Sequence, residues 1–138
     1  MNNTRVYPFA VQDNALAADL DTVGGKGLSL ASMTAAGFPV PAGFTVTTAA
    51  YRQFVSDNGL QEAIIDGAKP ELVGTAVSFD SASQQIQALF AEAELTDELK
   101  AQIGSAYTAF GAGEPPVAVR SSANAEDLPD LSFAGQQD

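Results

Sequence analysis

At 138 residues, the chain is large enough for one ordinary domain with an apolar core and too short for a multidomain enzyme. Its 6 Lys and Arg against 17 Asp and Glu give a net charge of −11, which disfavours nucleic-acid and anionic-membrane partners, and it has no Cys or His to supply thiol or imidazole chemistry. No run approaches the ~18 apolar residues of a membrane span and the first residues lack a secretory signal, so we expect a cytoplasmic protein.

The first half of the chain alternates between strand and helix patterns. In chain order these patterns predict an edge strand over residues 5–11, a helix between the glycines at 24–27 and Gly37, a strand over 43–47, a helix capped by Thr47 or Thr48 and ended by Asn58-Gly59, and a short helix near 60–65.

The second half is predominantly helical in pattern. It predicts a loop over 66–80, a helix that begins with a capping box of Ser81 and Gln84, a helix from Thr96 to about Phe110, a turn over 111–116 and a strand over 117–122. Together the elements predict an α/β (α+β) fold in which helices pack on a small mixed sheet.

The stretch Gly24-Gly25-Lys26-Gly27 is unfavourable for an isolated helix start. Each helical glycine costs roughly 0.5–1 kcal/mol relative to alanine, and Lys26 is at the positive end of the helix dipole. An anion bound above the turn would make this arrangement favourable, because backbone N–H groups, the helix end and the ammonium group would converge on it. The stretch therefore indicates a phosphate site, although it is not a Walker A loop and a plain glycine turn remains the alternative.

A second stretch, Val119-Arg120-Ser121-Ser122, places a cation at the end of the last predicted strand. Arg120 faces away from the apolar side of that strand, with the hydroxyl groups of Ser121 and Ser122 close behind. A guanidinium group matches two phosphate oxygens, whereas the alternative is an ion pair with Glu126 or Asp127. Since the chain has only six basic residues, the two stretches together indicate phosphate binding more specifically than either does alone.

The order and spacing of these motifs resemble those of a known family. Residues 23–27, Pro39-Val40-Pro41-Ala42-Gly43-Phe44, and the run from Val117 through Ala134-Gly135-Gln136-Gln137-Asp138 are similar to the nucleotide-binding domain shared by phosphoenolpyruvate synthase, pyruvate phosphate dikinase and rifampicin phosphotransferase. The resemblance covers roughly residues 20–138 and is weak between about 60 and 115.

The resemblance implies an ATP-grasp-like subdomain that binds Mg-ATP and passes a phosphate to a histidine on a separate domain. Lys26 and Arg120 would contact the phosphates of ATP, with Ser121 beside them and Gly135 in a loop that covers the nucleotide. The family's Mg²⁺ ligands lie beyond Asp138. Residues 1–138 would then be the N-terminal part of a truncated ATP-binding domain, inactive without the phosphohistidine domain as its partner.

Four functional interpretations remain open at this point. The run from Ser121 to Pro129 favours a phosphoenolpyruvate synthase-like enzyme (pyruvate, water dikinase), whereas Gly27 is more typical of dikinases and of rifampicin phosphotransferases, the antibiotic-modifying alternative. From other classes, the chain could be a non-catalytic nucleotide-binding module or a plain interaction domain.

Overall fold

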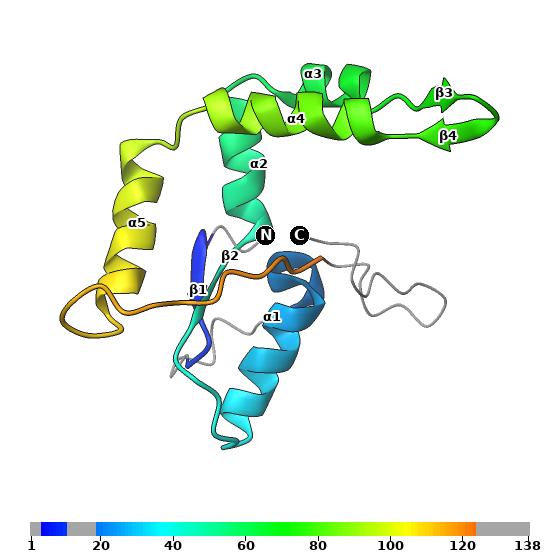
Figure 1. The fold of residues 1–138 in the computed structure, drawn as a ribbon. Coiled ribbons are helices and arrows are strands. Elements are labelled where there is room, and N and C mark those ends of the chain that lie inside the picture. Colours follow the sequence, from blue (N-terminus) through cyan, green and yellow to red (C-terminus); the bar gives the residue numbers. More distant parts are fainter. Residues whose placement is uncertain (1–3, 11–18, 124–138) are drawn as a thin grey trace. The chain divides into compact units, whose positions relative to one another are not determined.

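The computed structural model describes residues 4–10 and 19–123, and these form two compact units (Figure 1). One unit comprises Met1–Tyr51 and Asp97–Asp138, and the other comprises Arg52–Thr96. Each is described by itself below.

The core of the first unit lies between a pair of strands and the longest helix. Strand β1 (Val6–Pro8) pairs antiparallel with β2 (Phe44–Val46). Helix α1 (Leu20–Ala35) packs on β2, so that Tyr7, Val23 and Ala31 form a buried cluster with Leu28 at its edge. The strand predicted near the N-terminus is therefore present, and its apolar side chain at Tyr7 is buried.

Helix α1 begins earlier than its sequence predicts. Asp19 caps it, because the Asp19 carboxylate accepts hydrogen bonds from the Thr22 backbone N–H at 2.9 Å and from the Thr22 hydroxyl at 2.8 Å. The glycine-rich stretch therefore lies inside the helix, one turn after its start. Only the backbone of Gly24 departs from helical geometry there, with φ 72° and ψ 175°.

The other end of α1 is as predicted. The Gly37 N–H donates to the Thr34 carbonyl at 3.1 Å, and the Phe38 N–H donates to the Met33 carbonyl at 3.0 Å. This pair of bonds, with Gly37 at φ 83°, is a Schellman motif. Gly37 ends the helix because glycine adopts positive φ at little cost.

We expect the Asp19→Ala variant to lose about 1 kcal/mol of unfolding free energy, because the Thr22 N–H would lose its capping acceptor. Urea denaturation measures this loss. Asp19→Asn keeps a side-chain oxygen for the Thr22 N–H and should lose much less. Equal losses in the two variants would show that the cap is not the cause.

Helices α2 (Thr48–Asp57) and α5 (Asp97–Thr108) match the sequence-based predictions closely. Of the two capping candidates, Thr47 is the one that caps α2: it is 1% exposed, and its hydroxyl accepts from the Ala50 N–H at 3.4 Å while donating to the Thr4 carbonyl at 2.6 Å. Helix α5 buries Leu99 and joins β1 through an ion pair of 2.7 Å between Arg5 and Glu98.

The second unit holds the short helix α3 (Gln61–Gly67), which packs on α4 (Asp80–Glu92). Stacked rings of Phe54 and Phe90, with centroids 5.6 Å apart, join the end of α2 to α4. Helix α4 begins at Asp80, and Phe79, which precedes it, makes no side-chain capping bond, so the predicted capping box at Ser81 is wrong. Because the N-cap lies two residues earlier, at Phe79, Ser81 already lies within the first turn of the helix.

The segment predicted as a loop over 66–80 contains a hairpin instead. Strand β3 (Glu71–Val73) pairs antiparallel with β4 (Ala76–Ser78) across a two-residue turn in which Gly74 has φ 66°. A glycine in a two-residue loop between short apolar runs is a hairpin signal, which the first interpretation missed.

The sheet content confirms an α/β fold and corrects two details. Within the described residues the strands form two separate antiparallel pairs, not one mixed sheet. The segment 117–122 is not a strand there, and Val119, expected on an apolar face, is 92% exposed. Alternation alone does not make a strand, because a strand also needs a neighbour to pair with.

Candidate functional site

The break in α1 at Gly24 marks the centre of the candidate site. A φ of 72° with a ψ of 175° is a region that only glycine occupies readily. A Cβ on Gly24 would also lie 2.5 Å from the Ser122 carbonyl oxygen, closer than real Cβ contacts allow. The glycine therefore serves two needs, because it turns the backbone and leaves room for a segment almost 100 residues further along the chain.

That segment, residues 120–123, is bonded to the helix at the break. The Ser122 hydroxyl donates to the Val23 carbonyl at 2.7 Å and accepts from the Gly27 N–H at 3.1 Å. The Gly25 N–H donates to the Ala123 carbonyl at 3.0 Å. In Figure 1 the orange end of the described chain accordingly lies at the amino-terminal part of α1.

These bonds correct one part of the sequence interpretation. The backbone N–H groups of the glycine-rich turn were expected to be open to an anion, yet those of Gly25 and Gly27 are already bonded to Ala123 and Ser122. The positive charge offered at the turn thus comes chiefly from the Lys26 side chain.

Lys26 directly joins the two stretches singled out in the sequence. Its ammonium group donates to the Ser121 carbonyl at 3.2 Å, across 95 residues of chain, and the lysine is half-buried. A backbone carbonyl accepts a hydrogen bond from an ammonium group without neutralising its charge.

Arg120 is one residue from the carbonyl that Lys26 contacts. It is exposed, and among the described residues it has no hydrogen-bond or ion-pair partner. The alternative partners Glu126 and Asp127 and the loop residue Gly135 lie outside the described residues. The structure therefore brings Lys26, Arg120 and Ser121 to one locality and leaves Gly135 untested.

The same motifs fall within a region that matches a known protein family. A family model described as the pyruvate phosphate dikinase AMP/ATP-binding domain matches residues 20–138. The chain belongs to this family. The match begins at the first residue of α1 and includes both the lysine turn and the arginine segment.

Curated relatives of this dikinase-family chain are phosphoenolpyruvate synthases. The chain is 46% identical to a probable phosphoenolpyruvate synthase of Methanocaldococcus jannaschii over 87% of its length, 44% to that of Aeropyrum pernix over 86%, and 38% to that of Neisseria meningitidis over 91%. It spans only 10%, 15% and 17% of those proteins, respectively. No solved structure matches the chain.

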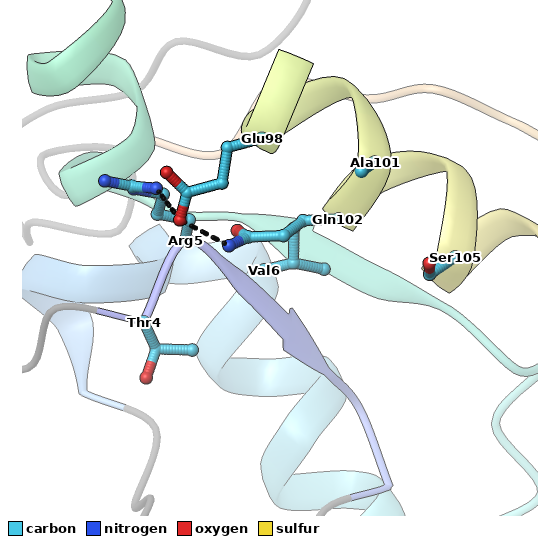
Figure 2. Close-up of a pocket in the computed structure, with 7 residues that line it drawn as sticks. All are labelled: Thr4, Arg5, Val6, Glu98, Ala101, Gln102 and Ser105. Carbon is cyan, nitrogen blue, oxygen red and sulfur yellow. Dashed lines mark hydrogen bonds and ion pairs between the residues drawn. The ribbon is translucent and has the colours of Figure 1, made fainter. Parts of the chain in front are cut away.

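One hollow in the first unit is not lined by the dikinase-family motifs. It has a volume of about 540 Å³ between β1 and α5, and Figure 2 shows the Arg5–Glu98 ion pair on its wall beside Gln102. Lys26, Arg120 and Ser121 are not among its lining residues. Because Glu98 pairs with Arg5, the hollow offers little free positive charge, and it does not suit a phosphate.

The family's implied metal can be tested against the acidic side chains. Across residues 4–10 and 19–123, no three Asp or Glu side chains are grouped closely enough to hold a metal ion. The described residues therefore do not fit an Mg²⁺ site, and we derive no chemistry through one.

In the same part of the chain, no helix combines the length and apolarity needed to cross a membrane.

Ser122 is the residue that the sequence interpretation undervalued. It was grouped with Ser121 as a hydroxyl donor near a phosphate, whereas its hydroxyl is engaged by α1. The adjacent positions of Ser121 and Ser122 could have indicated that their side chains differ in direction, because neighbouring residues of an extended segment point to opposite sides. One serine can therefore face the helix while the other stays exposed.

Proposed function

We propose that the chain is the ATP-binding segment of a phosphoenolpyruvate synthase-like phosphotransferase, with Lys26 and Arg120 as a clamp on the ATP phosphates. The observation that carries the proposal is the 3.2 Å bond from the Lys26 ammonium group to the Ser121 carbonyl. It supports the clamp because it brings a lysine and the backbone beside an arginine together from positions 95 residues apart.

The charge distribution supports the same assignment. A protein with a net charge of −11 repels a polyphosphate at long range, so binding must depend on local cations. Lys26 supplies a mobile point charge, and Arg120 supplies a planar fork that can grip two oxygen atoms. The exposed Ser121 hydroxyl adds a neutral donor. Clamps of this kind act by positioning the phosphates and by neutralising their charge.

For the parent protein, we propose that this ATP-grasp-like segment delivers a phosphate from ATP to a histidine on another domain, as a pyruvate, water dikinase does. Residues 1–138 would be the N-terminal part of the ATP-binding domain, which agrees with the 10–19% of the relatives' length that the chain spans. Mg²⁺ would be held by residues beyond Asp138, and Gly135 would lie over the nucleotide. Use of ATP favours a cytoplasmic location.

Isothermal calorimetry with Mg-ATP tests the clamp. Lys26→Ala and Arg120→Ala should each weaken ATP binding by about 10- to 100-fold, since a hydrogen bond to a charged group contributes about 1.5–3 kcal/mol. Lys100→Ala is the matched control, because Lys100 is an exposed lysine of α5 in the same unit and its loss changes the net charge equally.

The control separates a local clamp from a general charge effect. If Lys100→Ala weakens ATP binding as much as Lys26→Ala does, net charge is the cause and the clamp is wrong. ATP binding that is unchanged in both Lys26→Ala and Arg120→Ala would also refute the proposal, and would leave an interaction domain as the better interpretation.

A further inference from the structure

The Ser122 hydroxyl occupies a particular place in the hydrogen-bond ladder of α1. Val23 and Gly27 are four residues apart, and in a continuous α-helix the Gly27 N–H would donate to the Val23 carbonyl. At the Gly24 break the Ser122 hydroxyl bonds to both of these groups, accepting from the Gly27 N–H at 3.1 Å and donating to the Val23 carbonyl at 2.7 Å. Insertion of a side chain into the ladder is a recognised cause of a helix kink.

We propose that Ser122 is a positioning residue for the phosphate clamp. Its hydroxyl keeps α1 open at Gly24, which orients Lys26, and the same bonds attach the segment that carries Arg120. The inference rests on the proposed function in that ATP is the ligand so positioned. Ser122 acts through the two cations and need not touch the nucleotide.

The bonds on both sides of Lys26 support this role. Its neighbours Gly25 and Gly27 donate their N–H groups to Ala123 and Ser122, so the lysine backbone is fixed from both directions. With its backbone fixed, the lysine side chain reaches the Ser121 carbonyl. One short segment thus holds the lysine at three points.

Loss of the hydroxyl leaves these groups in an unfavourable position. Val23 is 2% exposed, so water has poor access to a carbonyl that loses its donor. A buried polar group without a partner is costly, and the direct bond between Gly27 and Val23 becomes the favourable alternative. Forming it would straighten α1 and release the segment from the helix.

Backbone ¹⁵N relaxation tests the attachment without any nucleotide. In the wild-type protein, the amides of residues 120–123 should have order parameters near 0.85, and in Ser122→Ala they should fall below about 0.6. Ser29→Ala is the control, since Ser29 is an exposed serine of α1, and it should leave these order parameters unchanged. Low order parameters in the wild type, or unchanged values in Ser122→Ala, would overturn the inference.

Calorimetry with Mg-ATP tests the link to the clamp. Ser122→Ala should weaken ATP binding about tenfold, as expected when a buried group loses its hydrogen-bond partner, and Ser122→Thr, which keeps the hydroxyl, should restore most of the affinity. In a Lys26→Ala background, Ser122→Ala should weaken binding much less than tenfold, because its effect passes through the lysine.

The two measurements keep the inference separate from the function on which it rests. A full tenfold effect of Ser122→Ala in the Lys26→Ala background would overturn positioning while leaving the clamp intact. If Lys26→Ala and Arg120→Ala do not alter ATP binding, the proposed function fails, and the role of Ser122 in positioning the clamp fails with it. The relaxation result then decides only whether Ser122 attaches the segment to α1.

Discussion

Gly24→Ala should lower the unfolding free energy by about 3 kcal/mol or more, a large fraction of the stability of an ordinary domain. Two costs add in this variant. The backbone at φ 72° and ψ 175° strains any residue with a Cβ by about 1–3 kcal/mol. The new Cβ would also meet the Ser122 carbonyl oxygen at 2.5 Å, and since that atom belongs to the backbone, the whole segment must move.

Gly37→Ala is the matched control for this variant. Gly37 also has positive φ, at 83°, but a Cβ there meets nothing within 4 Å, so the control carries the backbone strain alone. Gly24→Ala should therefore lose more free energy than Gly37→Ala, and guanidinium denaturation of both variants measures the difference. If the two variants lose the same free energy, residues 120–123 do not pack on Gly24 in solution.

The double variant Lys26→Ala/Arg120→Ala should weaken ATP binding by more than about 100-fold, because two charge-assisted contacts of about 1.5–3 kcal/mol each are lost. The reason is local, since Lys26 contacts the Ser121 carbonyl, one residue from Arg120, and these two residues are a third of the six Lys and Arg of an acidic chain. Calorimetry over a wide range of ATP concentration measures the loss.

Lys69→Ala/Lys100→Ala makes the same change in net charge at two exposed positions outside residues 24–27 and 120–123. It should bind ATP almost as well as the wild type does. Similar losses in the two double variants would assign ATP binding to overall charge and would remove Lys26 and Arg120 from the site.

Much of the helical structure was predictable from local sequence. The end of α1 at Gly37 and the start of α5 after Thr96 depend on interactions between residues close in sequence, so a few neighbouring residues predict them. Which of Thr47 and Thr48 caps α2 could not be predicted in this way, because it depends on the contact of the Thr47 hydroxyl with the Thr4 carbonyl, 43 residues away.

The strands were harder to predict because pairing partners decide them. The hairpin of β3 and β4 was missed although Gly74 gave a local signal, since its short runs are exposed and lack a clear apolar face. The opposite error occurred at 117–122, where Val117 and Val119 alternate convincingly. Within the described residues no strand pairs with that segment.

The proximity of the two sequence stretches was predictable, whereas the hydrogen bonds between them were not. Composition and motif chemistry singled out Lys26 and Arg120, and the structure brings Lys26 to the residue beside Arg120. That the N–H groups of Gly25 and Gly27 are used within the protein could not be foreseen, since their acceptors lie far along the chain at Ala123 and Ser122.

The Ser122 bonds also constrain the order of events during protein synthesis. They join residues 95 and 99 positions apart, so the ladder of α1 cannot be completed at Gly24 until the ribosome has released the chain through Ser122. The native contacts at the kink therefore form only after most of the chain has been made, at the entropic cost of closing a long loop.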